Sequence, residues 1–142
     1  MNAMETTRIF DLLKRYEQNF DKPDALVSKK NGEWTPVSSK EYIEQSHLFA
    51  YGLLSKGFKK GDKIASITHN CPEWNIIDMG MSMVGVVHVP IFNTLCQDEF
   101  RYIFEHSEVK AIFVSDAGIH KNCEPACAGF DCARLFHQSG TS

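Results

Sequence analysis

The chain has 142 residues, a length that fits one ordinary domain. Hydrophobic residues make up 43% and charged residues 23%, a balance typical of a globular protein and not of a disordered one. The net charge of −3 leaves no surplus of basic side chains, so we expect no nucleic-acid surface.

The lack of a recognisable secretory signal and the cysteine usage favour a cytoplasmic location. The N-terminus lacks an apolar core behind basic residues, so no secretory signal is expected. The most apolar window, residues 76–92, is interrupted by Asp78, His88 and Pro90 and is too short to span a membrane. Five cysteines form an odd count, which favours a reducing compartment. Peripheral contact with a membrane is left open.

The first 58 residues predict two helices that flank an antiparallel hairpin. Helical spacing extends to Phe20, and the pair Asn31-Gly32 between two short strand-like runs, 25–28 and 34–37, is a strong hairpin signal. We interpret this hairpin as a flap at one side of a sheet. Ser38-x-x-Glu41 is a capping box for the second helix. Gly57 followed by Phe58 predicts its left-handed end.

Residues 59–116 predict the core, a βαβαβ unit on a parallel sheet. Three runs rich in β-branched residues (63–68, 86–91 and 110–114) alternate with two helical patterns. The runs are continuously apolar, as in strands that are covered on both faces. The first helix, from Pro72 to Val84, is apolar around most of its circumference, so we expect cover from this chain or from a partner.

The second helix of this core is predicted to begin with a capping box at Thr94 and Gln97. Its helical spacing places four apolar residues on one face, namely Cys96, Phe100, Ile103 and Phe104. Right-handed crossovers put both helices on the same face of the sheet unless the strand order reverses between them, and the sequence leaves this open.

Beyond Asp116 the pattern fails, and we expect low order to the end of the chain. This tail carries metal-competent side chains: His120, Cys123, Cys127, Cys132 and His137. Their Cys-x3-Cys-x4-Cys spacing matches structural zinc sites poorly, so we favour reduced, exposed thiols in a loose segment. Residues 138–142 contain a Ser-Gly-Thr run too short to wrap a phosphate, which we interpret as a chance match.

Two further candidates have simpler explanations. His88 lies in an apolar strand without a nucleophile in its local sequence, so we interpret it as a core or subunit-contact histidine. Asn93 and Thr94 follow the carboxyl end of a parallel strand, the usual ligand edge of such sheets, but a plain turn and helix cap is the favoured interpretation.

Several of these short runs, in this order and spacing, resemble the N-terminal part of the adenylate-forming acyl-CoA synthetases, and most closely their long-chain fatty acid CoA ligase branch. The resemblance covers roughly residues 8 to 118. It rests on these residues: Trp34-Thr35, Gly61-Asp62-Lys63-Ile64-Ala65, Asn70, Pro72-Glu73-Trp74, Gly85-Val86-Val87, Val89-Pro90, Asn93-Thr94 and Phe113-Val114-Ser115-Asp116.

The resemblance implies an α/β fold, the three-layer N-terminal subdomain of an adenylate-forming enzyme, in residues 1–118, followed by a divergent or truncated tail in 119–142. It also implies a ligase of fatty acid metabolism that uses ATP, Mg²⁺ and CoA. The family's catalytic motifs lie downstream, so we assign no catalytic, cofactor-binding, substrate-binding or metal residue and expect this chain alone to bind no cofactor and to be inactive. Its partners would be the missing C-terminal part and the fatty acid substrate.

The competing hypothesis is a non-enzymatic α/β module for interaction or oligomerisation. It predicts self-association through the helix from Pro72 to Val84. Both hypotheses share the expectation of an exposed apolar patch on this helix, around Trp74, Ile77 and Met81.

Overall fold

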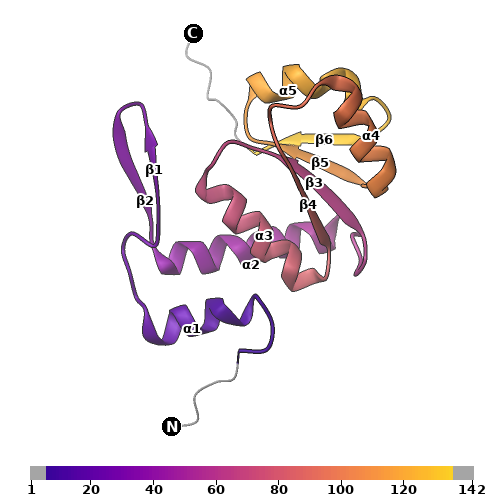
Figure 1. Ribbon diagram of the computed structural model, residues 1–142. Coiled ribbons are helices and arrows are strands. Elements are labelled where there is room, and N and C mark those ends of the chain that lie inside the picture. Colours follow the sequence, from indigo (N-terminus) through magenta and orange to yellow (C-terminus); the bar gives the residue numbers. More distant parts are fainter. Residues whose placement is uncertain (1–5, 136–142) are drawn as a thin grey trace. The chain divides into compact units, whose positions relative to one another are not determined.

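A computed structural model describes residues 6–135, which form two compact units (Figure 1). The first, here called the helical unit, contains residues 6–59 and 71–85. The second, the sheet unit, contains residues 60–70 and 86–135. Each unit is therefore assembled from two separate stretches of chain, and each is described on its own.

The helical unit contains three helices and a hairpin. Its elements are α1 (Asp11–Asn19), β1 (Leu26–Lys30), β2 (Glu33–Val37), α2 (Ser39–Ser55) and α3 (Pro72–Val84). The hairpin prediction is confirmed, because β1 and β2 pair antiparallel around Asn31 and Gly32, whose φ angles are +52° and +85°. The predicted capping box of α2 is also present.

Packing of α3 against α2 covers part of the apolar circumference of α3 (Figure 1). The expectation of an exposed patch on α3 is wrong for two of its three residues, since Ile77 is 2% and Met81 0% exposed, while Trp74 is half-buried. Gly80 permits the close approach of the two helices, with the Ser46 carbonyl and the Phe49 ring at the position a Cβ atom would need. Self-association through α3 stays a prediction.

The end of α2 is the predicted glycine stop. Gly57 has a φ of +84°, and the amides of Gly57 and Phe58 donate to the carbonyls of Leu54 and Leu53 at 3.0 and 3.1 Å. These two bonds define a Schellman motif, which satisfies carbonyl groups that the helix end would otherwise leave without a partner.

Replacing Gly57 by valine should lower the free energy of unfolding by about 1 kcal/mol or more, because a β-branched residue disfavours the left-handed conformation. Nothing lies within 4 Å of a Cβ atom at this position, so the cost is one of backbone conformation and not of collision. Urea denaturation measures it. Gly52→Ala, in the same helix with equally open space, is the control and should stabilise by about 0.5–1 kcal/mol. Equal stabilities of the Gly57 variant and the wild type would contradict the assignment.

The sheet unit contains a parallel sheet with the strand order β4-β3-β5-β6 (Figure 1). The three predicted strands are confirmed as β3 (Lys63–Ile67), β4 (Val87–Ile91) and β5 (Ala111–Val114), and the fourth is β6 (Asp131–Arg134). The order reverses at β3, because β4 lies on one side of it and β5 on the other. The sequence had left this strand order open.

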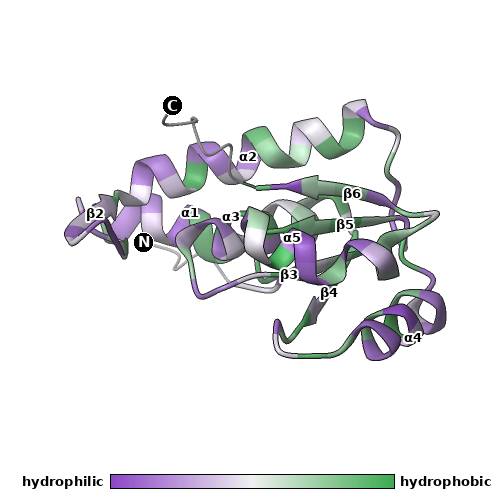
Figure 2. Cartoon of the chain, turned by 90° about the horizontal axis from the view of Figure 1, so that it is seen from above, coloured by the Kyte–Doolittle hydropathy of each residue, from purple (hydrophilic) through white to green (hydrophobic). Residues whose placement is uncertain are grey.

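Two helices and one short turn of 3-10 helix complete the sheet unit: α4 (Gln97–Ser107), α5 (Ala117–Cys123) and η1 (Glu124–Cys127). They bury one apolar cluster against the sheet, in which Phe100 and Phe104 of α4 are the largest side chains. Figure 2 shows β5 green along its length, whereas α4 carries both green and purple residues, as expected for a core strand and a surface helix. The remaining buried members are Ala65, Ile67, Val109, Ile112, Val114, Ile119, Cys123, Ala126 and Cys127.

The prediction of low order beyond Asp116 is wrong for residues 117–135, which form α5, η1 and β6. Asp116 begins this segment as the N-cap of α5, and its carboxylate accepts a hydrogen bond from the Ile119 amide. Because β6 pairs with β5, the ordered sheet extends past residue 118. The division into 1–118 and 119–142 as domains stays a prediction.

The predicted capping box of α4 is also misplaced. The N-cap is Cys96 and the reciprocal partner is Glu99, whose carboxylate accepts from the Cys96 amide at 2.8 Å. Thr94 lies in the turn before the helix and is exposed. Cysteine is not among the usual N-cap residues, so the sequence pattern favoured Thr94, two residues before the actual N-cap.

Candidate functional site

Polar side chains gather at the carboxyl edge of the parallel sheet. His69 follows β3 by two residues, Asn93 follows β4 by two, and Ser115 with Asp116 follows β5 directly. The edge is also where the strand order reverses, the place at which open α/β sheets bind their ligands. We call these four residues the edge cluster.

His69 is the centre of the edge cluster. The side-chain amide of Asn93 lies 2.9 Å from Nδ1 of His69, and a carboxylate oxygen of Asp116 lies 3.4 Å from Nε2. An amide that donates to Nδ1 leaves the ring proton on Nε2, facing the carboxylate. Both ring nitrogens are thus engaged, while 65% of the side chain is exposed. The arrangement orients an accessible imidazole and offers polar groups to a ligand, but it leaves no ring nitrogen free to act as a general base.

Asp116 connects the edge cluster to α5. Its carboxylate accepts from the Ser115 hydroxyl at 2.8 Å and from the Ile119 amide at 3.0 Å. Burial alone would raise the pKa of Asp116, but these two hydrogen bonds and the nearby His69 outweigh it, so the pKa is lowered. The hydroxyl of Ser115 also accepts from the His69 amide at 3.3 Å, which fixes the loop after β3.

Asp116→Ala should lower the free energy of unfolding at pH 7 by about 1 kcal/mol, the usual cost of losing an N-cap. Asp116→Asn keeps a cap oxygen and should lose less. The pKa of Asp116 is lower in the folded state than in the unfolded chain. The ionised carboxylate therefore stabilises the fold fully at pH values above the unfolded-state pKa, and this stabilisation is lost as the pH falls through the folded-state pKa. The stability gap between wild type and Asp116→Asn should therefore narrow from pH 7 toward acid in urea denaturation. A gap that widens in acid would contradict this assignment.

His88 has a partner that the local sequence did not reveal. Its Nε2 lies 2.7 Å from the hydroxyl of Ser66, on the neighbouring strand β3. Ser66 is 1% exposed, so no substrate reaches that hydroxyl and the pair does not form a nucleophile with its base. The interpretation of His88 as a core or subunit-contact histidine stays a prediction.

The metal-competent residues of the tail do not form a metal site in the part of the chain that the structure describes. No group of three or more His, Cys, Asp or Glu side chains among residues 6–135 is arranged to hold a metal ion. The expectation of exposed thiols is wrong, however, because Cys123 and Cys127 are buried and Cys132 is half-buried. His137 and residues 138–142 lie outside the described residues.

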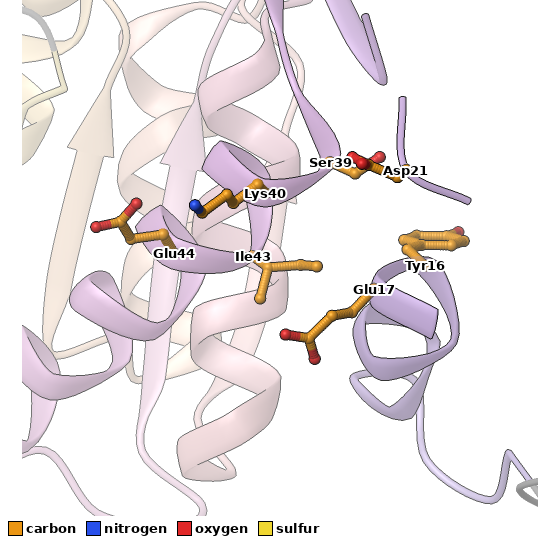
Figure 3. Close-up of a pocket in the computed structure, with 7 residues that line it drawn as sticks. All are labelled: Tyr16, Glu17, Asp21, Ser39, Lys40, Ile43 and Glu44. Carbon is orange, nitrogen blue, oxygen red and sulfur yellow. The ribbon is translucent and has the colours of Figure 1, made fainter. Parts of the chain in front are cut away.

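A separate pocket lies between α1 and α2 of the helical unit and has a volume of about 440 Å³ (Figure 3). Three of its lining side chains, Glu17, Asp21 and Glu44, carry carboxylates, against one basic side chain, Lys40. This balance repels a fatty acid carboxylate or a nucleotide phosphate. The charge of the pocket therefore disfavours both ligands.

Cofactor chemistry needs groups that residues 6–135 do not supply. This part of the chain contains no glycine-rich phosphate loop. It also lacks a cluster of acids arranged for Mg²⁺. We therefore assign no ATP or metal site to the described residues and derive no catalytic step from them. None of the helices described within residues 6–135 is long and apolar enough to cross a membrane.

Solved structures share the fold of this chain. A Rhodopseudomonas palustris protein assigned as a long-chain-fatty-acid CoA ligase superposes with a TM-score of 0.75 at 20% identity, covering 97% of this chain and 35% of that chain. A fatty acid AMP ligase of Legionella pneumophila superposes with a TM-score of 0.70 at 13% identity, covering 82% and 21%. The fold is that of adenylate-forming enzymes.

Sequence comparison places the chain within this class. The model of the AMP-binding enzyme family matches residues 14–135, so the chain belongs to that family. A long-chain-fatty-acid–CoA ligase of Mycobacterium bovis, FadD15, is 32% identical over 100 residues, which are 69% of this chain and 17% of that protein. Human long-chain-fatty-acid–CoA ligase 1 is 30% identical over 115 residues, or 78% of this chain and 16% of that protein. The chain thus spans less than a fifth of the length of these two relatives.

Proposed function

We propose that this chain is part of an ATP-dependent long-chain fatty acid CoA ligase, which joins a fatty acid carboxylate to AMP and then passes the acyl group to coenzyme A. The family match over residues 14–135 is the observation that carries the proposal. The names of the mycobacterial and human relatives support a long-chain fatty acid as the substrate. The comparisons do not support the alternative of a non-enzymatic interaction module.

Within such an enzyme, the chain supplies a folded part and not the reaction centre. The phosphate loop and the metal-binding acid that the adenylation chemistry requires are absent from residues 6–135. The edge cluster contributes polar groups at the ligand edge of the sheet. We expect activity to require the remaining part of the enzyme, as well as ATP, Mg²⁺ and CoA.

A chimera tests the proposal. The matched 100 residues of the Mycobacterium bovis ligase are replaced by those of this chain, and acyl-CoA formation from palmitate, ATP, Mg²⁺ and CoA is measured. We expect the chimera to form palmitoyl-CoA. The chimera with Tyr102→Ala, at an exposed position of α4, should keep this activity, whereas the chimera with Phe104→Ala, at a buried one, should lose it. A chimera that is folded by circular dichroism and inactive would overturn the proposal.

The 142-residue chain alone is assayed in parallel for fatty-acid-dependent exchange of pyrophosphate into ATP. No exchange is expected. Exchange above the rate of a reaction without fatty acid would contradict the requirement for the rest of the enzyme, and would place the catalytic groups within this chain.

A further inference from the structure

Three of the five cysteines converge at the junction between α5 and β6 of the sheet unit. Cys123 ends α5, Cys127 ends η1, and Cys132 lies in β6, next to β5. The sulfur atoms of Cys123 and Cys127 are 3.7 Å apart, with the Cys127 thiol donating to Cys123, and Cys132 lies close enough to influence the pKa values of both thiols. The remaining two cysteines, Cys71 and Cys96, lie elsewhere and belong to no such group.

The surroundings of these thiols hold them together. Cys123 and Cys127 belong to the buried core, and half-buried Cys132 packs against it. From α4, the Gln97 side chain accepts a hydrogen bond from the Ala126 amide at 3.2 Å, and the Arg101 guanidinium donates to the Ala126 carbonyl at 3.4 Å. The η1 segment that carries Cys127 is therefore fixed beside Cys123.

The three thiols differ in their acidity. The thiol of Cys132 donates a hydrogen bond that lowers the pKa of Cys123, and the Cys127 thiol donates a second. Burial raises the pKa of Cys127, and the interaction with Cys123 raises that of Cys132. Cys123 is thus the most acidic of the three thiols and lies beside two neighbours whose pKa values are raised.

We propose that Cys123 and Cys127 form a reversible thiol–disulfide site, oxidised by a small hydroperoxide, with Cys132 positioning the reactive sulfur. The Cys123 thiolate attacks the nearer peroxide oxygen, the O–O bond breaks, and the sulfenic acid and an alkoxide or hydroxide form. The Cys127 thiol then attacks the sulfenic sulfur, its proton leaves with the hydroxyl group as water, and the disulfide forms. The two thiols lose two electrons, which reduce the peroxide bond.

Burial selects the oxidant. Cys123 is 0% exposed, so it meets an oxidant only when the segment around it opens locally, and a small molecule such as hydrogen peroxide needs a smaller opening than a bulky disulfide such as oxidised glutathione. Cys96 is exposed and accessible to both reagents, which makes it the internal control. The proposal concerns only this chain and is independent of the ligase function proposed above.

Peptide mass spectrometry tests the site directly. Trypsin cleaves after Lys121 and Arg134 and releases residues 122–134, which contain all three thiols in one peptide. After treatment of the folded 142-residue chain with hydrogen peroxide, this peptide should lose two hydrogen atoms and accept one alkylating group, on Cys132. Oxidised glutathione should instead modify Cys96 and leave residues 122–134 fully alkylatable. Dithiothreitol should restore all three thiols.

Three results would overturn the proposal: a disulfide that includes Cys132, oxidation of Cys96 before the tryptic peptide changes, or the same mixture of pairings in urea as in the folded chain. Cys132→Ala should still form the disulfide, but more slowly. Cys127→Ala should leave a sulfenic acid on Cys123 that dimedone traps. If Cys127→Ala does not fold, the comparison of folded and urea-unfolded wild type decides the question alone.

Discussion

Phe104→Ala should lower the free energy of unfolding by about 3–5 kcal/mol, the usual cost of emptying a buried aromatic site. The Phe104 side chain is 0% exposed and contacts two other rings, Phe100 at a centroid distance of 6.2 Å and Phe130 at 5.6 Å. Its loss leaves a cavity under α4 and removes packing between this helix and the segment before β6. Urea denaturation followed by circular dichroism measures the change.

Tyr102→Ala is the matched control for Phe104→Ala, because it removes an aromatic ring from the same helix at a position that is 65% exposed. Its effect should stay within about 0.5 kcal/mol. Similar losses in the two variants would show that α4 does not bury Phe104 as described.

Gly80→Leu should lower the free energy of unfolding by about 3 kcal/mol, at the upper end of the usual cost of overpacking. A Cβ atom at Gly80 would lie 2.6 Å from Cδ1 of Phe49 and 3.0 Å from the Ser46 carbonyl oxygen. The Phe49 ring can rotate away, but the carbonyl belongs to the backbone of α2 and moves only with the helix. Even Gly80→Ala should destabilise, although alanine favours a helix by about 1 kcal/mol over glycine.

Gly52→Leu is the control for Gly80→Leu. Gly52 also lies within a helix, but nothing occupies the space within 4 Å of its Cβ position. The variant should be as stable as the wild type or slightly more stable, since leucine is the better helix former. If Gly80→Leu is as stable as Gly52→Leu, then α2 and α3 do not meet at Gly80. Thermal denaturation of the two variants and the wild type under the same conditions measures the difference in stability.

The core elements were predictable because their sequences carry strong local signals. The runs at 63–68, 86–91 and 110–114 became β3, β4 and β5, and the helix from Pro72 to Val84 has the predicted bounds. The elements after Asp116 were missed because their order comes from tertiary contacts. The β6 sequence, Asp-Cys-Ala-Arg, has no β-branched residue, and its strand conformation rests on backbone pairing with β5. The sequence does carry one signal for α5, because an Asp directly after a predicted strand is a typical helix N-cap, and Asp116 accepts a hydrogen bond from the Ile119 amide.

The edge cluster was only partly predictable. Asn93 was identified as lying at the ligand edge, and a turn was the favoured interpretation, which the structure also shows. His69 and Asp116 are 47 residues apart and meet because β3 and β5 are neighbours in the sheet. A sequence alone does not give strand order, so it could not pair them. All four members lie within two residues of the end of a strand, so the sequence indicates their positions but not their hydrogen bonds.

The interleaving of the two units determines how the chain can be dissected. Cleavage of the chain after residue 59 places α2 and α3 in different fragments. Cleavage after residue 85 leaves β3 in the fragment with the helical unit, while β4 and β5 are in the other fragment. No single cleavage therefore releases either unit with all its parts. During synthesis, α2 leaves the ribosome before α3 exists, so the helical unit is completed only after the first strand of the sheet unit has been made.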